Sequence, residues 1–469
     1  MARQIRHVAL VLFAAFALVS AGTIWWQILH ADALGTSASN PRPAELARTA
    51  NRGRILDRNG VVLAQSVPQP DGTRVREYVD PSLGPTIGYV STRYGLVGIE
   101  QEENAYLSGR ESGDPLAGAL DDLLHRQPRG GDVTLTIDER LQHAAAAALG
   151  DRPGAVVALD PRTGAVLAMV SSPGFDASTI DRTGEALLHD PRKPLLNRAT
   201  QGLYPPGSVY KIVTATAALD TGIVKPTDIY RCSGSGIVID GFVIGCENAP
   251  PGQTQWDFKT AFAYSINATF AQVAATQLGS DLFLEYSHRF GLDRPLPFDL
   301  PTAISRTSIN GGALGRVLLA SSGFGQGQLQ VTPLQIALIG ATVANGGVEP
   351  RPYLVQQVQA ADGSVLFSRT PEQVRRVMKP ETAATLTDFM KAAVQEFGGI
   401  AGMLGQDIAG KTGTAETGVS SAADSWFVGF MPAEHPGIVV AAIVENGGPG
   451  SQAAAPVAEA VFKAYRAGQ

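Results

Sequence analysis

Apolar residues follow two patterns along this chain. One is a long stretch without charge, residues 8–29 (VALVLFAAFALVSAGTIWWQIL), which as a helix is long enough to span the hydrocarbon core of a membrane. The other is a set of short apolar runs broken by Gly and Pro, which is typical of strands. These runs lie at residues 154–173, 408–418, 425–432 and 437–448.

The short apolar runs lie at the two ends of a region whose middle has helical and loop patterns. Residues 451–468 close the chain with one more helical pattern. A single antiparallel sheet made from both ends, with helices on its faces, is the simplest arrangement of these elements. A regular alternation of strands and helices is absent, which argues against a doubly wound parallel sheet. We therefore predict an α+β fold.

A smaller region precedes this sheet. Residues 31–50 are small and polar with two prolines, which is typical of a linker. Asn59-Gly60 between two apolar runs predicts a hairpin, and residues 132–150 predict a strand followed by an alanine-rich helix that a glycine ends. We expect residues 67–130 to be irregular. The predicted division is a cytoplasmic tip and membrane anchor at 1–30, a small pedestal domain at 31–150 and the main domain at 151–469.

The apolar stretch near the amino terminus has the flanks of a membrane anchor. Arg3 and Arg6 precede it, so the amino end is expected in the cytoplasm, and Trp25 and Trp26 lie at the opposite end, where aromatic residues favour the membrane interface. The alternative is a cleaved secretory signal, although the apolar core of such a signal is usually shorter. Both interpretations place the rest of the chain outside the cytoplasmic membrane.

The two cysteines of the chain, Cys232 and Cys246, lie close together in the sequence. In an oxidising compartment such a pair favours a disulfide, and two unpaired thiols are the alternative. We expect the disulfide to rigidify a loop beside the cleft. No histidine lies near either cysteine, so we expect no metal site there, and we expect no cofactor elsewhere.

Charge narrows the choice of partners. The 469 residues carry a formal net charge of −6. The chain has no block rich in Lys and Arg, and this argues against nucleic acid as a main partner.

Ser208 and Lys211 lie three residues apart, directly after Pro-Pro-Gly, where a predicted helix begins that ends at Gly222. Residues at this spacing share a helix face, so the lysine amine can come within reach of the serine hydroxyl. A partly desolvated lysine can take the proton of a serine nucleophile, and the first helical turn favours developing negative charge. Taken alone, however, the pair is better interpreted as a capping serine and a solvated lysine.

A second polar pair, Ser265 and Asn267, interrupts an alanine-rich helical pattern. Residues two apart do not share a helix face, so both can point into one cleft only from a turn or loop. There the serine can relay a proton and the asparagine can hold a substrate amide. A simple polar break in the helix is the alternative.

A third motif, Lys411-Thr412-Gly413, is followed by Thr414. On an edge strand it offers a cation for a carboxylate and a glycine that lets another backbone approach. The N–H groups of Thr414 and Ser208 could then form an oxyanion hole. Residues 405–412 also match the phosphate-loop pattern as a string, but the strand-to-helix context of that loop is missing and the location is extracytoplasmic.

In this order, Ser-x-x-Lys, Ser-x-Asn and Lys-Thr-Gly form the signature of penicillin-binding proteins and serine β-lactamases. The chain resembles the class B penicillin-binding proteins, in particular the penicillin-binding protein A type of actinobacteria, over nearly its whole length. Further segments carry the resemblance: RGRILDRNG, GLVGIEQ, VTLTIDERLQ, LDPRTGAVLAMVSSPGFD, NRATQGLYPPGSVYK, GFGQGQLQVTPLQ and DSWFVGFMP. It implies a membrane helix, a pedestal and a transpeptidase domain with the penicillin-binding and β-lactamase-like fold.

The resemblance also implies a D,D-transpeptidase of cell-wall synthesis and cell division. Ser208 would attack the D-Ala-D-Ala bond of a peptidoglycan stem peptide, and the amine of a neighbouring stem would resolve the acyl-enzyme. β-Lactam antibiotics would acylate the same serine. Lys211 would act as the base, Ser265 and Lys411 would complete the proton network, and Lys411 with Thr412 and Thr414 would bind the terminal carboxylate.

Other functions stay open at this point. A glycosyltransferase domain does not fit in the region before the main domain, so we expect a separate membrane glycosyltransferase and other cell-wall synthesis proteins as partners. A serine β-lactamase would need a group that activates water, and no glutamate occurs between Glu285 and Glu349. A D,D-carboxypeptidase, and a non-catalytic scaffold of the division machinery or β-lactam sensor, are the remaining alternatives.

Overall fold

The computed structural model describes residues 2–26, 51–71, 73–111, 129–309, 311–396, 402–418 and 422–469. The predicted linker at residues 31–50 lies outside these ranges. Helix α1 (Ala2–Ile24) includes an apolar segment, Arg3–Ile24, with a mean hydropathy of 2.1 and no part buried in the protein. By length and composition it can cross a membrane, and a signal sequence would have the same character.

The main sheet is antiparallel and has the strand order β17-β18-β19-β7-β8. Strands from the two ends of the main domain therefore lie side by side, which confirms the prediction for this sheet. Strand β17 forms one edge. All positions of the other four strands are buried. The strands are β7 (Gly154–Leu159), β8 (Val166–Ser172), β17 (Ala409–Ala415), β18 (Asp424–Met431) and β19 (Ile438–Val444).

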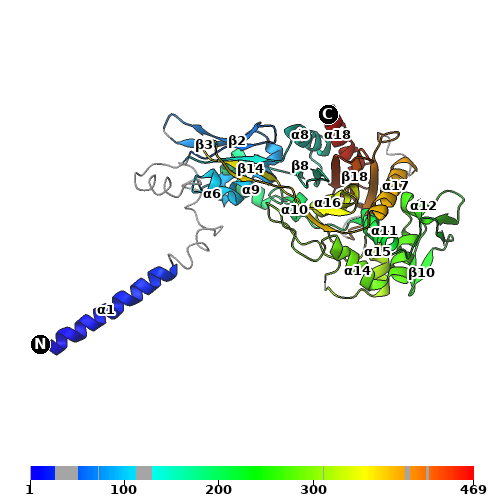
Figure 1. The fold of residues 1–469 in the computed structure, drawn as a ribbon, viewed down its shortest axis with the longest axis horizontal. Helices are drawn as coiled ribbons and strands as arrows, with labels where there is room; N and C mark the ends of the chain where they lie inside the picture. Colours follow the sequence, from blue (N-terminus) through cyan, green and yellow to red (C-terminus); the bar gives the residue numbers. More distant parts are fainter. Residues whose placement is uncertain are drawn as a thin grey trace.

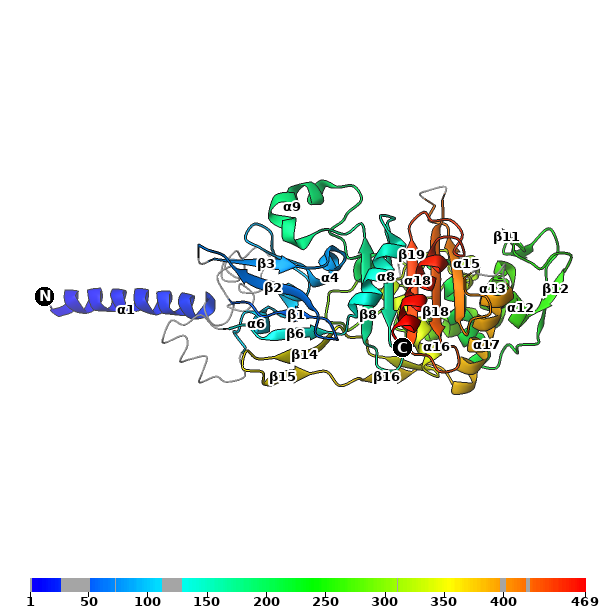
Figure 2. The same cartoon turned by 90° about the horizontal axis from the view of Figure 1, so that it is seen from above.

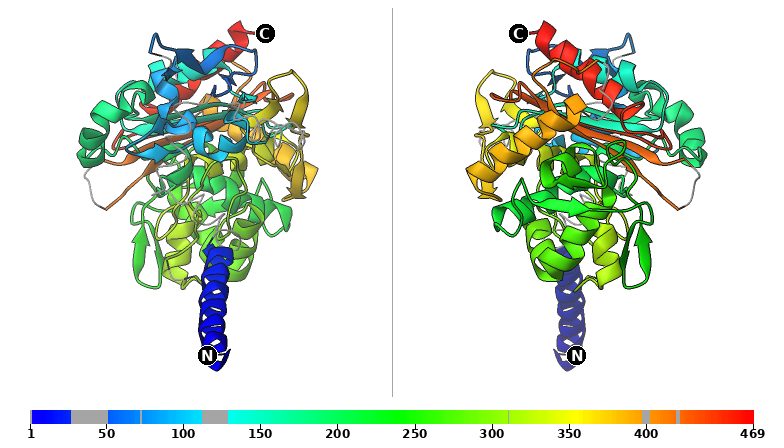
Figure 3. Two further views of the ribbon diagram at one scale, coloured as in Figure 1. Left: turned by 90° about the vertical axis from the view of Figure 1, so that its left-hand side faces the viewer. Right: turned by 90° about the vertical axis from the view of Figure 1, so that its right-hand side faces the viewer.

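Helices cover both faces of this sheet, which explains why its central strands are buried at every position rather than at alternate ones. On one face lie α18 (Ala454–Ala467) and α8 (Glu139–Leu149). On the other lies α16 (Pro333–Ala344), whose first eleven residues are all buried. Figure 3 shows the sheet between α18 and the larger helical part of the domain.

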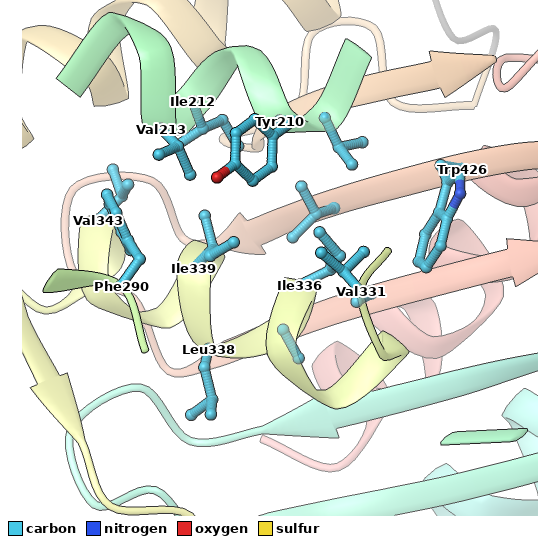
Figure 4. Packing of buried hydrophobic residues seen from close by; sticks show 14 of the residues in the cluster. Tyr210, Ile212, Val213, Phe290, Val331, Ile336, Leu338, Ile339, Val343 and Trp426 are labelled. Carbon is cyan, nitrogen blue, oxygen red and sulfur yellow. The ribbon is translucent and has the colours of Figure 1, made fainter. Parts of the chain in front are cut away.

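The larger helical part lies beyond α16 and carries the segments around the first two motifs (Figure 1). Tyr210, Ile212 and Val213 pack toward α16, where Ile336 and Ile339 meet them (Figure 4). Its helices are α11 (Lys211–Asp220), α12 (Phe258–Ala263), α13 (Asn267–Gln272), η5 (Val273–Leu278), α14 (Gly279–Arg289), α15 (Arg316–Gly323) and α17 (Pro380–Glu396). The short strands are β9 (Ile229–Arg231), β10 (Ile237–Ile239), β11 (Phe242–Ile244) and β12 (Gln255–Asp257).

The pedestal is built on a second sheet with the order β15-β14-β6-β1-β2-β3 (Figure 2). The predicted hairpin at Asn59-Gly60 joins β1 to β2, and the strand and helix expected at 132–150 are β6 and α8. The strands are β1 (Ile55–Leu56), β2 (Val62–Pro68), β3 (Arg74–Tyr78), β6 (Asp132–Leu135), β14 (Val355–Gln359) and β15 (Val365–Ser368).

Residues 67–130 are more regular than expected wherever they are described. Besides β3 they form the strands β4 (Val90–Ser91) and β5 (Gly95–Leu96). They also form the helices η2 (Pro81–Leu83), α4 (Gly84–Ile87), α5 (Ile99–Glu102) and α6 (Asn104–Leu107). The prediction that this segment is irregular is therefore wrong for its described residues. Its helices and strands are separated by Gly and Pro and are too short to show a hydrophobic period in the sequence.

The boundary at residue 150 does not separate the two sheets. Strands β14 and β15 come from the main domain in sequence, yet β14 pairs with β6 of the pedestal. Helix α8 precedes residue 150, yet it packs on the main sheet beside α18. The remaining elements are η3 (Ala177–Thr179), α9 (Ile180–His189), α10 (Arg198–Gln201), η4 (Gly207–Tyr210), β13 (Val348–Pro350) and β16 (Gln373–Arg376).

Candidate active site

Ser208 lies in the short 3-10 helix η4, immediately before α11, and is half-buried. Gly207 before it has φ +56°, a conformation that glycine adopts at low cost. Its N–H donates to the Gly325 carbonyl over 2.8 Å, and a Cβ built on Gly207 would lie 2.8 Å from the Thr414 carbonyl oxygen. The turn that carries Ser208 is thus held between the loop after α15 and the edge strand β17.

Ser265 and Asn267 flank the break between α12 and α13, as the spacing predicted. Ser265 has φ +61°, which for a residue other than glycine costs on the order of 1–3 kcal/mol. Ser265 is 4% exposed, and Asn267 is the first residue of α13. This strained turn directs the side chains of Ser265 and Asn267 toward Lys211. Backbone strain of this kind is typical of functional sites.

Lys211 is fully buried and joins the first two motifs. Its Nζ donates to the Ser265 carbonyl over 2.6 Å and to Asn267 Oδ1 over 2.7 Å, and Ser265 Oγ lies 3.0 Å away. Burial, and secondly the charge of Lys411, hold the pKa of Lys211 well below its usual range. Two fixed acceptors use two N–H groups of a neutral amine, so its lone pair is left for a hydroxyl group.

The hydroxyl of Ser208 makes no hydrogen bond to Lys211 within the described part of the chain. The spacing placed the two residues on one helical turn, and that placement holds because η4 continues into α11. What the spacing did not predict is that the turn at Ser265 and the first residue of α13 supply the partners of the amine. Lys211 therefore links the nucleophile turn to Ser265 and Asn267.

Lys411 lies on the edge strand β17, as predicted, and is 1% exposed. Its Nζ donates to the Thr412 carbonyl over 3.1 Å and lies 5.9 Å from the centre of the Phe262 ring. Burial lowers the pKa of Lys411 to about 7. Gly413 is buried, and Thr412 is half-buried beside it. The three motifs thus meet between β17 and the helices α11 to α13.

Supporting residues that the motifs do not include hold the segment before Ser208. The Glu445 carboxylate accepts from Arg198 Nε over 2.7 Å and from Tyr204 Oη over 2.8 Å. Trp426 Nε1 donates to the Pro205 carbonyl over 3.0 Å. Arg198 and Tyr204 belong to the NRATQGLYPPGS segment that the sequence singled out. Their partner Glu445, directly after β19, is brought to them only by the fold.

The predicted disulfide is present. Cys232 and Cys246 are bonded, with Cα atoms 6.1 Å apart, and they close a loop that contains β10 and β11. Cys232 is buried in the same core as Trp256, whose Nε1 donates to Thr269 Oγ1 on α13 over 2.9 Å. Strand β11 of the loop itself contacts α13, whose first residue, Asn267, accepts from Lys211.

Replacing both cysteines, in Cys232→Ser/Cys246→Ser, should lower the free energy of unfolding by about 3 kcal/mol, because the unfolded chain gains freedom in a loop of roughly 15 residues. We also expect acylation by penicillin to slow several-fold, since the support of α13 loosens. Thermal unfolding and acylation kinetics of the variant test both effects. An unchanged midpoint together with an unchanged rate would contradict this role of the disulfide.

Two protein-family models match the chain. Residues 154–465 match the penicillin binding protein transpeptidase domain, and residues 52–133 match the penicillin binding protein A dimerisation domain. The chain belongs to the penicillin-binding protein transpeptidase family and is a serine-type penicillin-binding enzyme. The predicted family and fold are thereby confirmed.

Individual relatives define the type within this family. The chain is 36% identical to the peptidoglycan D,D-transpeptidase PbpA of Mycolicibacterium smegmatis over 98% of both chains, and 33% identical to that of Mycobacterium tuberculosis over 99% of both. The ceftriaxone acyl-enzyme of M. tuberculosis penicillin-binding protein A has a TM-score of 0.83 at 34% identity, covering 90% of this chain and 99% of that one. Its penicillin G acyl-enzyme has a TM-score of 0.81 at 34% identity, covering 89% and 100%. The predicted penicillin-binding protein A type is confirmed.

Proposed function

We propose that the protein is a membrane-anchored peptidoglycan D,D-transpeptidase with Ser208 as its nucleophile. The observation that carries this proposal is the buried amine of Lys211, which is held by Ser265 and Asn267 one helical turn from Ser208. Because burial holds the pKa of Lys211 well below its usual range, the amine loses its own proton more readily than an exposed lysine and can accept the serine proton. The PbpA relatives carry the same activity in their names.

The β17 edge is proposed to bind the donor peptide. Lys411 and Thr412 would hold the terminal carboxylate, since an ammonium group and a hydroxyl are suitable donors to it. Gly413 keeps the strand clear of side chains beside the nucleophile turn. The N–H groups of Ser208 and Thr414 would form the oxyanion hole, as the closeness of Gly207 to the Thr414 carbonyl supports.

The reaction then follows in two balanced steps. Ser208 Oγ forms a bond to the carbonyl carbon of the penultimate D-Ala, and the amide bond to the terminal D-Ala breaks. The hydroxyl proton moves to Lys211 and reaches the leaving amine through Ser265. In the second step the amine of a neighbouring stem peptide attacks the ester carbonyl, and the ester bond to Ser208 breaks. The proton of that amine returns to Ser208 through Ser265 and Lys211. In both steps Asn267 Nδ2 would donate a hydrogen bond to the amide carbonyl of the donor peptide.

We infer that α1 anchors the enzyme in the cytoplasmic membrane with the catalytic domain outside. Arg3 and Arg6 lie at its amino-terminal end, before the uncharged stretch that begins at residue 8, and this supports the orientation. The three units at 1–30, 31–150 and 151–469 stay our proposal for the domain division. A membrane glycosyltransferase and other cell-wall synthesis proteins are the proposed partners, because the chemistry proposed for the site joins peptides and does not polymerise glycan.

The test uses the full chain in detergent, mixed with penicillin G, with intact mass followed over time beside Ser208→Ala. We expect one long-lived adduct of the mass of the antibiotic, absent from the variant. Rapid loss of the adduct would instead identify a hydrolase, and no adduct would favour the scaffold interpretation. Exchange of a labelled D-amino acid into a D-Ala-D-Ala peptide, compared with simple release of D-Ala, then separates a transpeptidase from a carboxypeptidase.

A further inference from the structure

The free edge of β17 offers backbone groups to the cleft at every second residue. Successive residues of an antiparallel strand direct their N–H and C=O groups to opposite edges. The Thr414 carbonyl faces the turn of Ser208, because a Cβ on Gly207 would approach it to 2.8 Å. Thr412 and Glu416 are two residues to either side, so their backbone groups face the same cleft.

The side-chain amide of Gln326 already occupies this edge at Glu416. In the orientation that satisfies both partners, its nitrogen donates to the Glu416 carbonyl and its oxygen accepts from the Glu416 N–H, each over 3.2 Å. Two such bonds to one residue are the pairing that a neighbouring antiparallel strand would make. Gln326 therefore takes the place of a peptide group beside β17.

The loop that carries Gln326 is fixed on the nucleophile turn. Its backbone N–H donates to the Ser321 carbonyl over 3.0 Å, and the preceding Gly325 accepts from the Gly207 N–H over 2.8 Å. A Cβ on Gly325 would lie only 1.8 Å from the Gly207 carbonyl oxygen, so the two backbones pack directly. The position of Gln326 is thus set relative to Ser208. This also gives a role to the GFGQGQ segment, which the three motifs leave without one.

We infer that Gln326 ends the donor-binding edge of β17 and thereby determines how much of the stem peptide is recognised by strand pairing. The inference rests on the proposed transpeptidase function. With the terminal carboxylate at Lys411 and the penultimate residue paired with Thr414, the amide group that precedes the third residue from the carboxyl end falls opposite Glu416. Gln326 holds those hydrogen bonds, so the donor leaves the edge after its last two residues.

The experiment compares a short and a long donor in the wild-type full chain and in Gln326→Ala. N-acetyl-D-Ala-D-Ala and Nα,Nε-diacetyl-L-Lys-D-Ala-D-Ala are added as competitors of acylation by a fluorescent penicillin, and the protection constant of each peptide is measured. Removing Gln326 opens the Glu416 groups to the longer peptide. The preference for the longer peptide over the shorter one should then rise roughly fivefold in the variant, because the Nα-acetyl carbonyl can accept one added hydrogen bond, from the Glu416 N–H.

The matched control is Gln328→Ala, two residues further along the same loop, whose Oε1 accepts from the Ile309 N–H over 3.1 Å and which should leave the preference unchanged. Acylation by penicillin without competitor should stay within about twofold of the wild-type rate in Gln326→Ala.

An unchanged preference for the longer peptide, or no protection by either peptide in the variant, would overturn the inference. A tenfold or larger fall in acylation would also overturn it, since Gln326 would then position the Thr414 N–H instead. If wild-type penicillin acylation at Ser208 were itself absent, the proposed function would fail rather than the role of Gln326.

Discussion

Replacing Lys211 by methionine should reduce acylation by penicillin at least about 1,000-fold at pH 7.5. The amine is fully buried, its pKa is held well below the usual lysine range, and it lies at the start of the helix that follows the turn of Ser208. General-base groups contribute on the order of 100- to 10,000-fold to a rate. The second-order rate constant of acylation, measured with a fluorescent penicillin, gives the result directly.

The pH profile separates a base from a residue that merely fills space. The neutral form of Lys211 is the active one, so the wild-type rate should fall on acidification through a pKa well below the usual lysine range. The residual rate of Lys211→Met should lack this dependence. Ser265→Ala is the matched comparison, because it leaves the Ser265 carbonyl and Asn267 on the amine and should cost less. If the acylation rate of Lys211→Met fell on acidification in the same way as that of the wild type, the base would have to be another group.

Sequence reasoning succeeded where chemistry depends on local spacing. Ser265 and Asn267 could share a cleft only from a turn, and the structure places Ser265 at φ +61° between two helices. Lys411 was placed on a strand because the short apolar run around it matched the strand pattern, and the structure puts that strand at the edge of the sheet. In both cases the regular repeat of side-chain directions along a helix or strand limits where neighbouring side chains can point.

Contacts between distant segments could not be predicted in this way. Nothing in the pattern of Val355–Gln359 indicates that this strand joins β6 of the pedestal rather than the main sheet. The acceptors of Lys211 lie in the turn at Ser265 and at the start of α13, and spacing alone pointed to Ser208. Gln326 meets Glu416 through a side-chain amide, for which no periodic pattern exists. Each of these contacts depends on how elements pack in three dimensions, which a single sequence leaves open.

Replacing Lys411 by methionine should have two effects of opposite sign. Acylation by penicillin should fall on the order of 100- to 1,000-fold, because the carboxylate of the antibiotic loses a preorganised cation. The folded protein should become more stable at pH 7, by about 1–3 kcal/mol, because a buried lysine is exchanged for an apolar side chain of similar length. Thermal unfolding and acylation kinetics of the same preparation measure both.

The sign of the stability effect follows from the lowered pKa. Burial lowers the pKa of Lys411 to about 7, whereas in the unfolded chain it stands at about 10.4. Between these values the unfolded state binds more protons, so this group makes the free energy of unfolding rise with pH from about 7 to above 10. The stabilisation by Lys411→Met should therefore be largest at or below pH 7 and shrink toward pH 10.

The control is Lys225→Met, at an exposed position, which should change neither the acylation rate nor the free energy of unfolding. A lower unfolding midpoint at pH 7 would contradict the argument, because it would mean that the contacts of Lys411 outweigh the cost of burying its charge. The enzyme would then keep its carboxylate-binding cation without any sacrifice of stability.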